Sequence, residues 1–463
     1  MREEILVVGL GVIGLPTALS FFERGYPVIA YDKDVAKVAE LSLGFYKSQC
    51  PKDMLGVYEN SLCEFSSLPY VNQIEISKLN DITAVIVCVN ADYKEEARGF
   101  DLSNVFSTFE NVILPLLDIR KNKEGQKPLL ISIESTLPIG GMKNQILSLL
   151  KDFEEVEDYI LVYAPERITL ERPMYNLQNM PRVLGLSFSL VWDKEVFAGI
   201  EDRVINLYKG NCSWQCSFVS WETAEIVKLA ENAHRYVNIA FANQIAEICD
   251  MQDVNYNDVM RCVNSLPNVE GNERINPVRN LMYAGVGVGG YCLEKDTRAL
   301  SSFFESSDAT CKQSLLRASL YFNACKVRQC VGERVIDCLN GYRNLEKVVR
   351  VLFLGATGIP NTGDSRNSYT YGLMRDLNSV CVISSLRVTF DYFDPYINPA
   401  QGDKTNLEEF DVAMKGVDVL ILSVPHNIFK CWLDPSFYYE LEGRRVLDLN
   451  KWKGKVIREE EGK

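Results

Sequence analysis

The sequence predicts an α/β protein in which two Rossmann-like, doubly wound domains are joined by a central helical region with one long helix. Apolar runs alternate with helical stretches in the first part of the chain, a long helical segment follows, and the alternation then resumes. Strands that alternate with helices form parallel sheets covered on both faces. At 463 residues the chain is also too long for one hydrophobic core. We therefore expect domains at residues 1–212, 213–335 and 336–463.

Strands and helices follow from the spacing of apolar residues. In the first domain we expect a helix at 13–24 and strands at 4–8, 28–31, 84–89, 129–133 and 160–163. Residues 222–249 contain neither Gly nor Pro, and their apolar residues recur every three or four positions. They predict a helix roughly 40 Å long at about 1.5 Å per residue, which suits a spine between domains and a dimer surface. In the last domain we expect strands at 348–354, 387–393, 417–424 and 445–448.

Composition excludes several classes of function. The 49 Lys and Arg against 62 Asp and Glu give a net charge of −13, which argues against non-specific nucleic-acid binding. We expect no membrane span, no secretion segment and a cytoplasmic protein, because no apolar run reaches about 18 residues. The 14 cysteines follow no disulfide or metal-site spacing, and two histidines leave little material for a zinc site or a Ser-His-Asp triad. We therefore expect no metal.

A dinucleotide-binding motif opens the chain. The segment Gly9-Leu10-Gly11-Val12-Ile13-Gly14 fits G-x-G-x-x-G between an expected strand and an expected helix. Asp32 follows the second strand, where a carboxylate accepts hydrogen bonds from ribose hydroxyls and repels a 2′-phosphate. Lys33 is followed directly by Asp34, so we expect no cationic pocket for that phosphate. The motif predicts NAD rather than NADP.

A glycine-rich segment at 285–296 contains a candidate nucleophile. Four glycines within six residues let the backbone lie close to a ligand, and Cys292 follows at an expected loop-to-helix junction that favours a thiolate. Asp296, four residues later, would face the same way on a helix. A single cysteine among 14 is more often a packing residue, and the glycines are what favour a catalytic role here.

The long helix contains a second candidate pair. Lys228 and Asn232 lie four residues apart and project from one face, where they could act as oxyanion donors in a cleft. A solvated polar stripe is the alternative, and spacing alone favours it.

Six segments in order resemble the UDP-glucose/GDP-mannose dehydrogenase family of nucleotide-sugar 6-dehydrogenases. They are GLGVIGLP at the start, STLPIG at 135–140, APER at 164–167, and the segments at 222–248, 285–300 and 354–368. The resemblance covers nearly the whole chain. It implies an NAD domain, a central dimerisation region and a C-terminal domain that binds the nucleotide of a UDP-sugar.

The resemblance also implies a four-electron oxidation with two NAD. The sugar C6 alcohol becomes an aldehyde, the Cys292 thiolate captures it as a thiohemiacetal, and a thioester is formed and hydrolysed. Lys228 and Asn232 match the family's oxyanion and proton-transfer pair. Asp296 and Thr136 match residues that organise the hydrolytic water, with Glu166 beside them.

Other residues are assigned to ligand binding. Arg274 matches a family arginine that reaches substrate, in some members across a homodimer. We also assign Arg167, Gly289-Gly290 and Tyr291 to the substrate. Arg366, in a glycine-containing loop after an expected strand, is the most plausible partner of a phosphate and is counted with the cofactor residues, with a structural role as its alternative.

Departures from the family pattern leave the substrate open. Val87-Cys88-Val89-Asn90 replaces a Thr-Pro pair near the nicotinamide, and Ile359 replaces a lysine. Tyr291 resembles the UDP-glucose branch, whereas Pro165-Glu166-Arg167 resembles the N-acetylhexosamine branch. We favour a UDP-N-acetylhexosamine, then UDP-glucose, then GDP-mannose. The rival classes are a single-step NAD dehydrogenase and a non-catalytic nucleotide-sugar-binding homologue.

Overall fold

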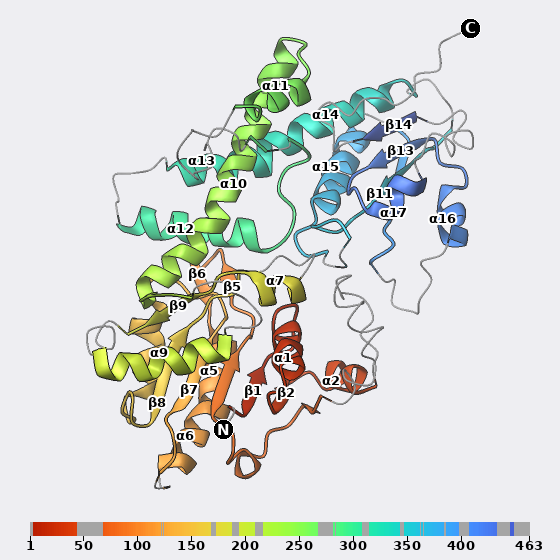
Figure 1. Cartoon of the computed structure of the whole chain (residues 1–463). Helices are drawn as coiled ribbons and strands as arrows, with labels where there is room; N and C mark the ends of the chain where they lie inside the picture. The colour runs from red at the N-terminus through yellow and green to blue at the C-terminus, as the bar shows by residue number, and fades with distance from the viewer. Residues whose placement is uncertain are drawn as a thin grey trace. The chain divides into compact units, whose positions relative to one another are not determined.

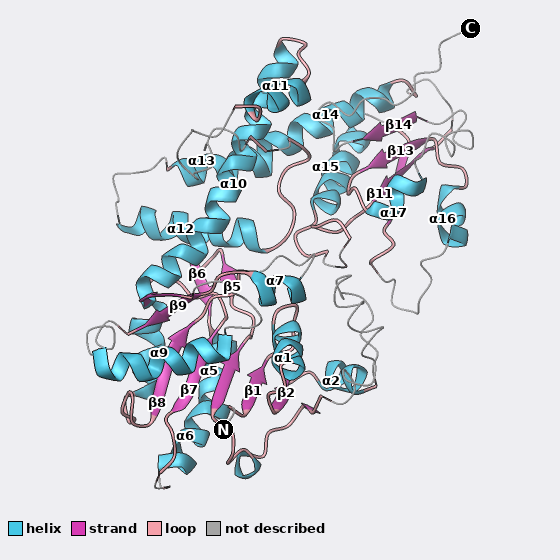
Figure 2. Cartoon of the chain, in the orientation of Figure 1, coloured by secondary structure: helices cyan, strands magenta, loops and turns pink. Residues whose placement is uncertain are grey.

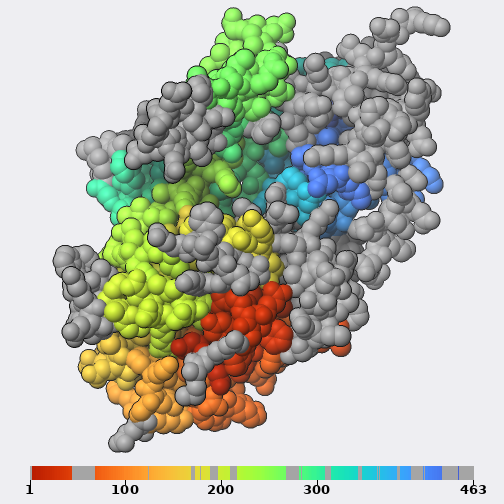
Figure 3. Space-filling model, viewed as in Figure 1, coloured from red at the N-terminus to blue at the C-terminus, as the bar shows by residue number. Residues whose placement is uncertain are grey.

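The computed structural model describes most of the chain as two units, Met1–Glu231 and Asn232–Lys463. The residues outside the described ranges are grey in Figure 2 and Figure 3. The three-domain division at 212 and 335 stays a prediction. The described residues are 3–43, 68–121, 123, 125–167, 173–187, 194–208, 216–266, 281–282, 284–307, 314–342, 347–361, 363, 365–383, 386–397, 407–432 and 445–448.

In the described part of the first unit, one sheet has the order β10-β9-β8-β7-β4-β1-β2-β3 (Figure 1). Neighbouring strands are parallel except β8 and β9, which are antiparallel. The predicted strands at 28–31 and 129–133 are confirmed to the residue, whereas β9 and β10 were not anticipated. The strands are β1 (Ile5–Val8), β2 (Val28–Tyr31), β3 (Tyr70–Val71), β4 (Ala84–Val87), β7 (Leu129–Ile133), β8 (Tyr159–Tyr163), β9 (Val183–Leu186) and β10 (Ser217–Ser220), beside a hairpin of β5 (Asp92–Lys94) and β6 (Gly99–Asp101).

Helices cover both faces of this sheet, because successive strand residues point to opposite sides. Ile5 and Val7 belong to a core with α1 (Gly14–Glu23) and α9 (Lys194–Tyr208). Leu6 and Val8 belong to the opposite core. The remaining helices of this unit include α2 (Val35–Ser42), α5 (Ser103–Thr108), α6 (Leu114–Lys121) and α7 (Pro173–Asn179).

The predicted long helix is α10 (Trp221–Met251). Its residues up to Glu231 belong to the first unit and the rest to the second. It is followed by α11 (Tyr256–Val263), α12 (Cys292–Ser307), α13 (Leu315–Tyr321) and α14 (Val327–Asn340). Within the described ranges, no helix combines the length and apolarity needed to cross a membrane.

The second unit contains a parallel sheet whose described strands have the order β12-β11-β13-β14 (Figure 2). One core lies between this sheet and α14 and α15 (Tyr369–Ile383), and another includes residues of α16 (Leu407–Met414) and α17 (Asn427–Trp432). The prediction of two Rossmann-like sheets with helical material between them is confirmed. The strands are β11 (Val349–Leu354), β12 (Val388–Phe393), β13 (Val419–Leu422) and β14 (Arg445–Asp448).

Candidate active site

The dinucleotide loop lies between β1 and α1, where its glycines are required by geometry. Gly9 has a φ of +92°, and a Cβ atom on Gly14 would lie 1.7 Å from the Gly9 carbonyl oxygen. A Cβ on Gly11 would meet nothing within 4 Å. Val12 and Ile13 are half-buried and complete the turn. The backbone is therefore tightly packed at Gly9 and Gly14 and open at Gly11, which fits the close approach of a dinucleotide.

Asp32 is buried at the end of β2 and fastens this loop. Its carboxylate accepts hydrogen bonds from the backbone N–H of Leu10 at 2.8 Å and of Asp34 at 2.9 Å. Lys37 contributes an ion pair at 2.9 Å. Burial alone would raise the pKa of Asp32, but Lys37 and the two backbone donors outweigh it and lower that pKa. The side chain is thus an ionised acceptor.

Lys37 is a cation that sequence reasoning missed. It lies one turn into α2, and its side chain reaches back to Asp32. The prediction that this loop offers no cationic pocket for a 2′-phosphate did not consider Lys37. The lysine is paired with the carboxylate, which leaves the preference for NAD intact.

The loop that contains Thr136 follows β7 and is fixed on both sides. Ser135 donates to the carbonyl oxygen of Val89 at 2.6 Å, and the Tyr163 hydroxyl accepts from the Leu137 N–H at 3.2 Å. Glu225, fully buried on α10, accepts from the backbone N–H groups of Gly140 at 2.6 Å and Met142 at 2.8 Å. These bonds hold half-buried Thr136 in one place relative to the start of α10.

Glu166 directly follows the Ala164-Pro165 pair after β8 and is buried between two arginines. Its Oε2 pairs with Arg182 Nη1, and its Oε1 accepts the backbone N–H of Arg167 at 2.8 Å. The Arg167 guanidinium turns away to a two-point ion pair with Glu231 of α10, with Nε 2.8 Å from one carboxylate oxygen. Arg167, predicted to touch substrate, therefore links the β8 loop to α10 in this structure.

A second buried carboxylate, Glu134, lies in the same unit and was also missed. Its Oε1 accepts from the Tyr208 hydroxyl at 3.0 Å, and its Oε2 lies 3.4 Å from Thr17 Oγ1 and 3.5 Å from Cys88 Sγ. Glu134 follows β7 as Glu166 follows the neighbouring β8. The carboxyl ends of adjacent parallel strands meet at one edge of a sheet, so the sequence did contain a signal for this pair.

In the second unit, Cys292 is the first residue of α12 and is exposed. Asp296 lies one helical turn later and is fully buried. Its Oδ2 accepts from the Asn232 amide at 2.5 Å, and the Lys295 ammonium lies 2.7 Å from Oδ1 without the alignment of a hydrogen bond. Asn232, predicted as an oxyanion donor, thus orients Asp296 with one of its two N–H groups.

The glycines before Cys292 make a close backbone contact. A Cβ on Gly289 would lie 2.8 Å from the Gly358 carbonyl oxygen, and one on Gly358 would lie 2.5 Å from the Gly290 nitrogen. Their small size therefore brings the cysteine segment against the loop after β11. Arg366 from that same loop lies over the Tyr291 ring, 5.1 Å from its centroid. The structure thus brings together Tyr291 and Arg366, one predicted for substrate and the other for cofactor.

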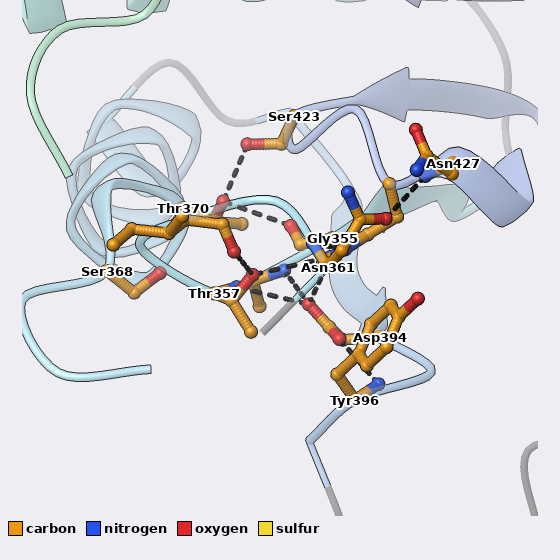
Figure 4. Close-up of polar contacts among 12 residues, drawn as sticks. Gly355, Thr357, Asn361, Ser368, Thr370, Asp394, Tyr396, Ser423 and Asn427 are labelled. Carbon is orange, nitrogen blue, oxygen red and sulfur yellow. Dashed lines mark hydrogen bonds and ion pairs between the residues drawn. The ribbon is translucent and has the colours of Figure 1, made fainter. Parts of the chain in front are cut away.

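The β11 loop repeats the geometry of the first dinucleotide loop (Figure 4). Gly355 has a φ of +89°, and Asp394 after β12 accepts the N–H groups of Ala356 at 2.7 Å and Thr357 at 3.1 Å. His426 accepts the Asn361 N–H at Nδ1, which leaves Nε2, 3.1 Å from Asp394, to donate. Asp394 stands where Asp32 stands in the first unit, a correspondence that sequence reasoning missed.

Two predicted residues have little structural context. Lys228 is half-buried on α10. Arg274 lies outside the described residues. Across the described part of the chain, no group of three His, Cys, Asp or Glu side chains could hold a metal ion.

Comparison with known proteins gives matches along most of the chain. Residues 3–192 match the NAD binding domain of the UDP-glucose/GDP-mannose dehydrogenase family, and residues 222–324 match its central domain. A UDP-N-acetyl-D-mannosamine dehydrogenase of Methanococcus vannielii is 28% identical over 97% of this chain and 95% of its own. One of Yersinia pestis is 28% identical over 92% and 94%. The structure of the Pyrococcus horikoshii UDP-D-ManNAc dehydrogenase aligns with a TM-score of 0.74 at 23% identity, covering 99% of this chain and 96% of that one.

Proposed function

Because the chain belongs to the UDP-glucose/GDP-mannose dehydrogenase family, we propose that this NAD-dependent enzyme oxidises the C6 alcohol of a UDP-N-acetylhexosamine to the uronate. The observation that carries the proposal is Cys292 at the first position of α12, one turn before a buried Asp296 that Asn232 holds. Relatives named UDP-N-acetyl-D-mannosamine dehydrogenase make UDP-N-acetyl-D-mannosamine the first sugar to test.

The chain supplies a cofactor cradle and a nucleophile. The loop Gly9 to Gly14 and Asp32 would hold NAD, which accepts one hydride from C6 in each of the two oxidations. Cys292 is exposed at the first position of α12, so its sulfur is open to attack a substrate carbon. The thiolate adds to the aldehyde carbon, loss of hydride gives a thioester, and water breaks the C–S bond. Carboxylate and free thiol are the products.

The remaining roles are carried over from the family resemblance. Lys228 and the second N–H of Asn232 would stabilise the oxyanion of the thiohemiacetal. Asp296, Thr136 and Glu166 would organise the hydrolytic water. The burial and fixed hydrogen bonds of Asp296 and Glu166 suit that task, because each carboxylate is held in one orientation.

UDP-glucose is the second candidate substrate, since Tyr291 resembles that branch, and GDP-mannose is the third. The initial rate of NADH formation with UDP-N-acetyl-D-mannosamine, UDP-N-acetylglucosamine, UDP-glucose and GDP-mannose ranks them. We expect the highest kcat/KM with a UDP-N-acetylhexosamine. NADH formation with UDP-glucose alone would overturn the substrate choice, and none with any sugar would overturn the reaction.

We also propose a homodimer formed through α10, with residues 213–335 as the dimerisation region and 336–463 as the nucleotide-binding domain. Phe241, Ile248 and Met251 are 55%, 50% and 76% exposed on this helix, an unusual apolar surface for a monomer. Light scattering should give twice the chain mass, and Phe241→Glu should shift it toward the monomer. We also propose a cytoplasmic location, because free thiols such as those of Cys249 and Cys292 are typical of a reducing compartment.

A further inference from the structure

Four side chains in the first unit form a buried ionisable cluster, of which only Glu166 has a part in the proposed reaction. Glu134, Glu166, Arg182 and Tyr208 are between 4% and 9% exposed. They come from the ends of β7 and β8, the start of β9 and the end of α9. Burying a charge without a partner costs folding free energy, so the presence of several ionisable groups in one buried cluster calls for a functional explanation.

One guanidinium pairs with Glu166 and also acts electrostatically on Glu134. Arg182 pairs directly with Glu166 Oε2, and its Cζ lies 5.2 Å from the centroid of the Tyr208 ring. The hydroxyl of that ring donates to Glu134 Oε1 at 3.0 Å and lies 2.6 Å from Ser132 Oγ. Arg182 therefore binds Glu166 directly. It is linked to Glu134 through Tyr208, whose ring lies against the guanidinium and whose hydroxyl donates to Glu134.

The charges in this cluster do not balance when both carboxylates are ionised. Burial raises the pKa of Glu134 to about 7, Arg182 opposes the rise, and Glu166 adds to it. Burial also raises the pKa values of Cys88 and Tyr208 well above their ordinary range, so both stay neutral. Glu134 is therefore the member of the cluster whose charge changes near neutral pH.

We propose that Arg182 and Glu134 are positioning residues for Glu166: Arg182 holds the Glu166 carboxylate, and Glu134 competes for Arg182 once it is ionised. This inference rests on the proposed function for the role of Glu166. When Glu134 is neutral, Arg182 binds the Glu166 carboxylate alone. When Glu134 is charged, it attracts the same guanidinium, and Glu166 Oε2 is freer to accept a hydrogen bond from the hydrolytic water while Oε1 keeps its bond to the Arg167 N–H.

The direct test is the pH profile of kcat at saturating NAD and sugar. In the wild type, kcat should rise several-fold through a limb centred near the pKa of Glu134, and this limb should be absent from Glu134→Gln. Tyr208→Phe should move the limb to higher pH, because it removes the hydroxyl that donates to the carboxylate. Arg182→Met should remove the limb, because no cation is left for the two carboxylates to compete for, whereas Arg182→Lys keeps the charge and should retain the limb.

Glu155→Gln is the matched control. Glu155 is also a glutamate of the first unit whose pKa burial raises, but its bonded partner is Ser187 at 2.9 Å. Its pH profile should equal that of the wild type. A limb that persists unchanged in Glu134→Gln would overturn the inference.

A second measurement separates this inference from the proposed function. Urea unfolding midpoints of Glu134→Gln, Glu166→Gln and the double variant need no substrate. At about pH 6 the effect of Glu166→Gln should be the same with Glu or Gln at position 134, because both are neutral. At about pH 8.5 the effect of Glu166→Gln should differ between the two backgrounds, since the ionised Glu134 then competes for Arg182. Additive effects at both pH values would refute the competition, whatever the enzyme oxidises.

Discussion

Glu225 offers a prediction whose size follows from the structure. Its carboxylate is fully buried and accepts two backbone N–H groups of the loop after Thr136. Burial is the largest influence and raises the pKa of Glu225 to about 7, against the lowering by those two backbone donors. Glu225→Gln removes the ionisation while keeping nearly the same shape.

The sign follows from proton binding. Between the ordinary value of 4.5 and about 7, the folded protein holds a proton on Glu225 that the unfolded chain has released. Stability from this group is therefore fully present below pH 4.5 and is lost as the pH rises through 7. The pKa difference corresponds to about 3 kcal/mol. Gln gives up one acceptor for a backbone N–H, which costs about 1 kcal/mol at any pH.

The assay is urea unfolding at a series of pH values from about 5 to 8.5. Glu225→Gln should be nearly as stable as the wild type at the acid end, because the wild type has already lost about 1 kcal/mol of this stability at about pH 5, and about 2 kcal/mol more stable at the alkaline end. Exposed Glu40→Gln is the control and should follow the wild type at every pH. A constant difference between Glu225→Gln and the wild type would refute the reasoning, because it would show that Glu225 ionises normally.

Three further changes test the site. Gly14→Ala should abolish NAD binding measured by calorimetry, because its Cβ has no room beside the carbonyl oxygen of the first loop glycine. Asp32→Ser should raise the ratio of NADP to NAD activity, since it removes a repulsive carboxylate and frees Lys37; an unchanged ratio would contradict that role. Arg167→Met and Glu231→Gln should each lower kcat/KM, because each breaks the ion pair between the two residues. The kcat/KM of the double variant should then be no lower than that of either single variant.

Much of the fold could be predicted because its strands are short, continuous apolar runs. β2 and β7 match their predicted ranges, and α10 extends the predicted helix by one residue before and two after. Cys292 and Asp296 could be placed because the glycines mark the start of a helix. Asp394 could have been found by the same rule as Asp32, since each follows the second strand of its sheet.

The Arg182–Glu166 pair could not be predicted from spacing. Arg182 precedes β9, which runs antiparallel to β8, and only that pairing brings the arginine to the carboxyl end of β8. Nothing in the apolar pattern of the sequence indicates the reversal. The Lys37–Asp32 pair was not predicted for a similar reason, because the long lysine side chain reaches back across a helix turn to a residue five positions earlier.

A four-electron oxidation through Cys292 can be tested by the yield of NADH from a limiting amount of UDP-N-acetyl-D-mannosamine. We expect two NADH per sugar with the wild type and at most one with Cys292→Ser, which cannot form the thioester. One NADH per sugar from the wild type, or two from Cys292→Ser, would contradict it.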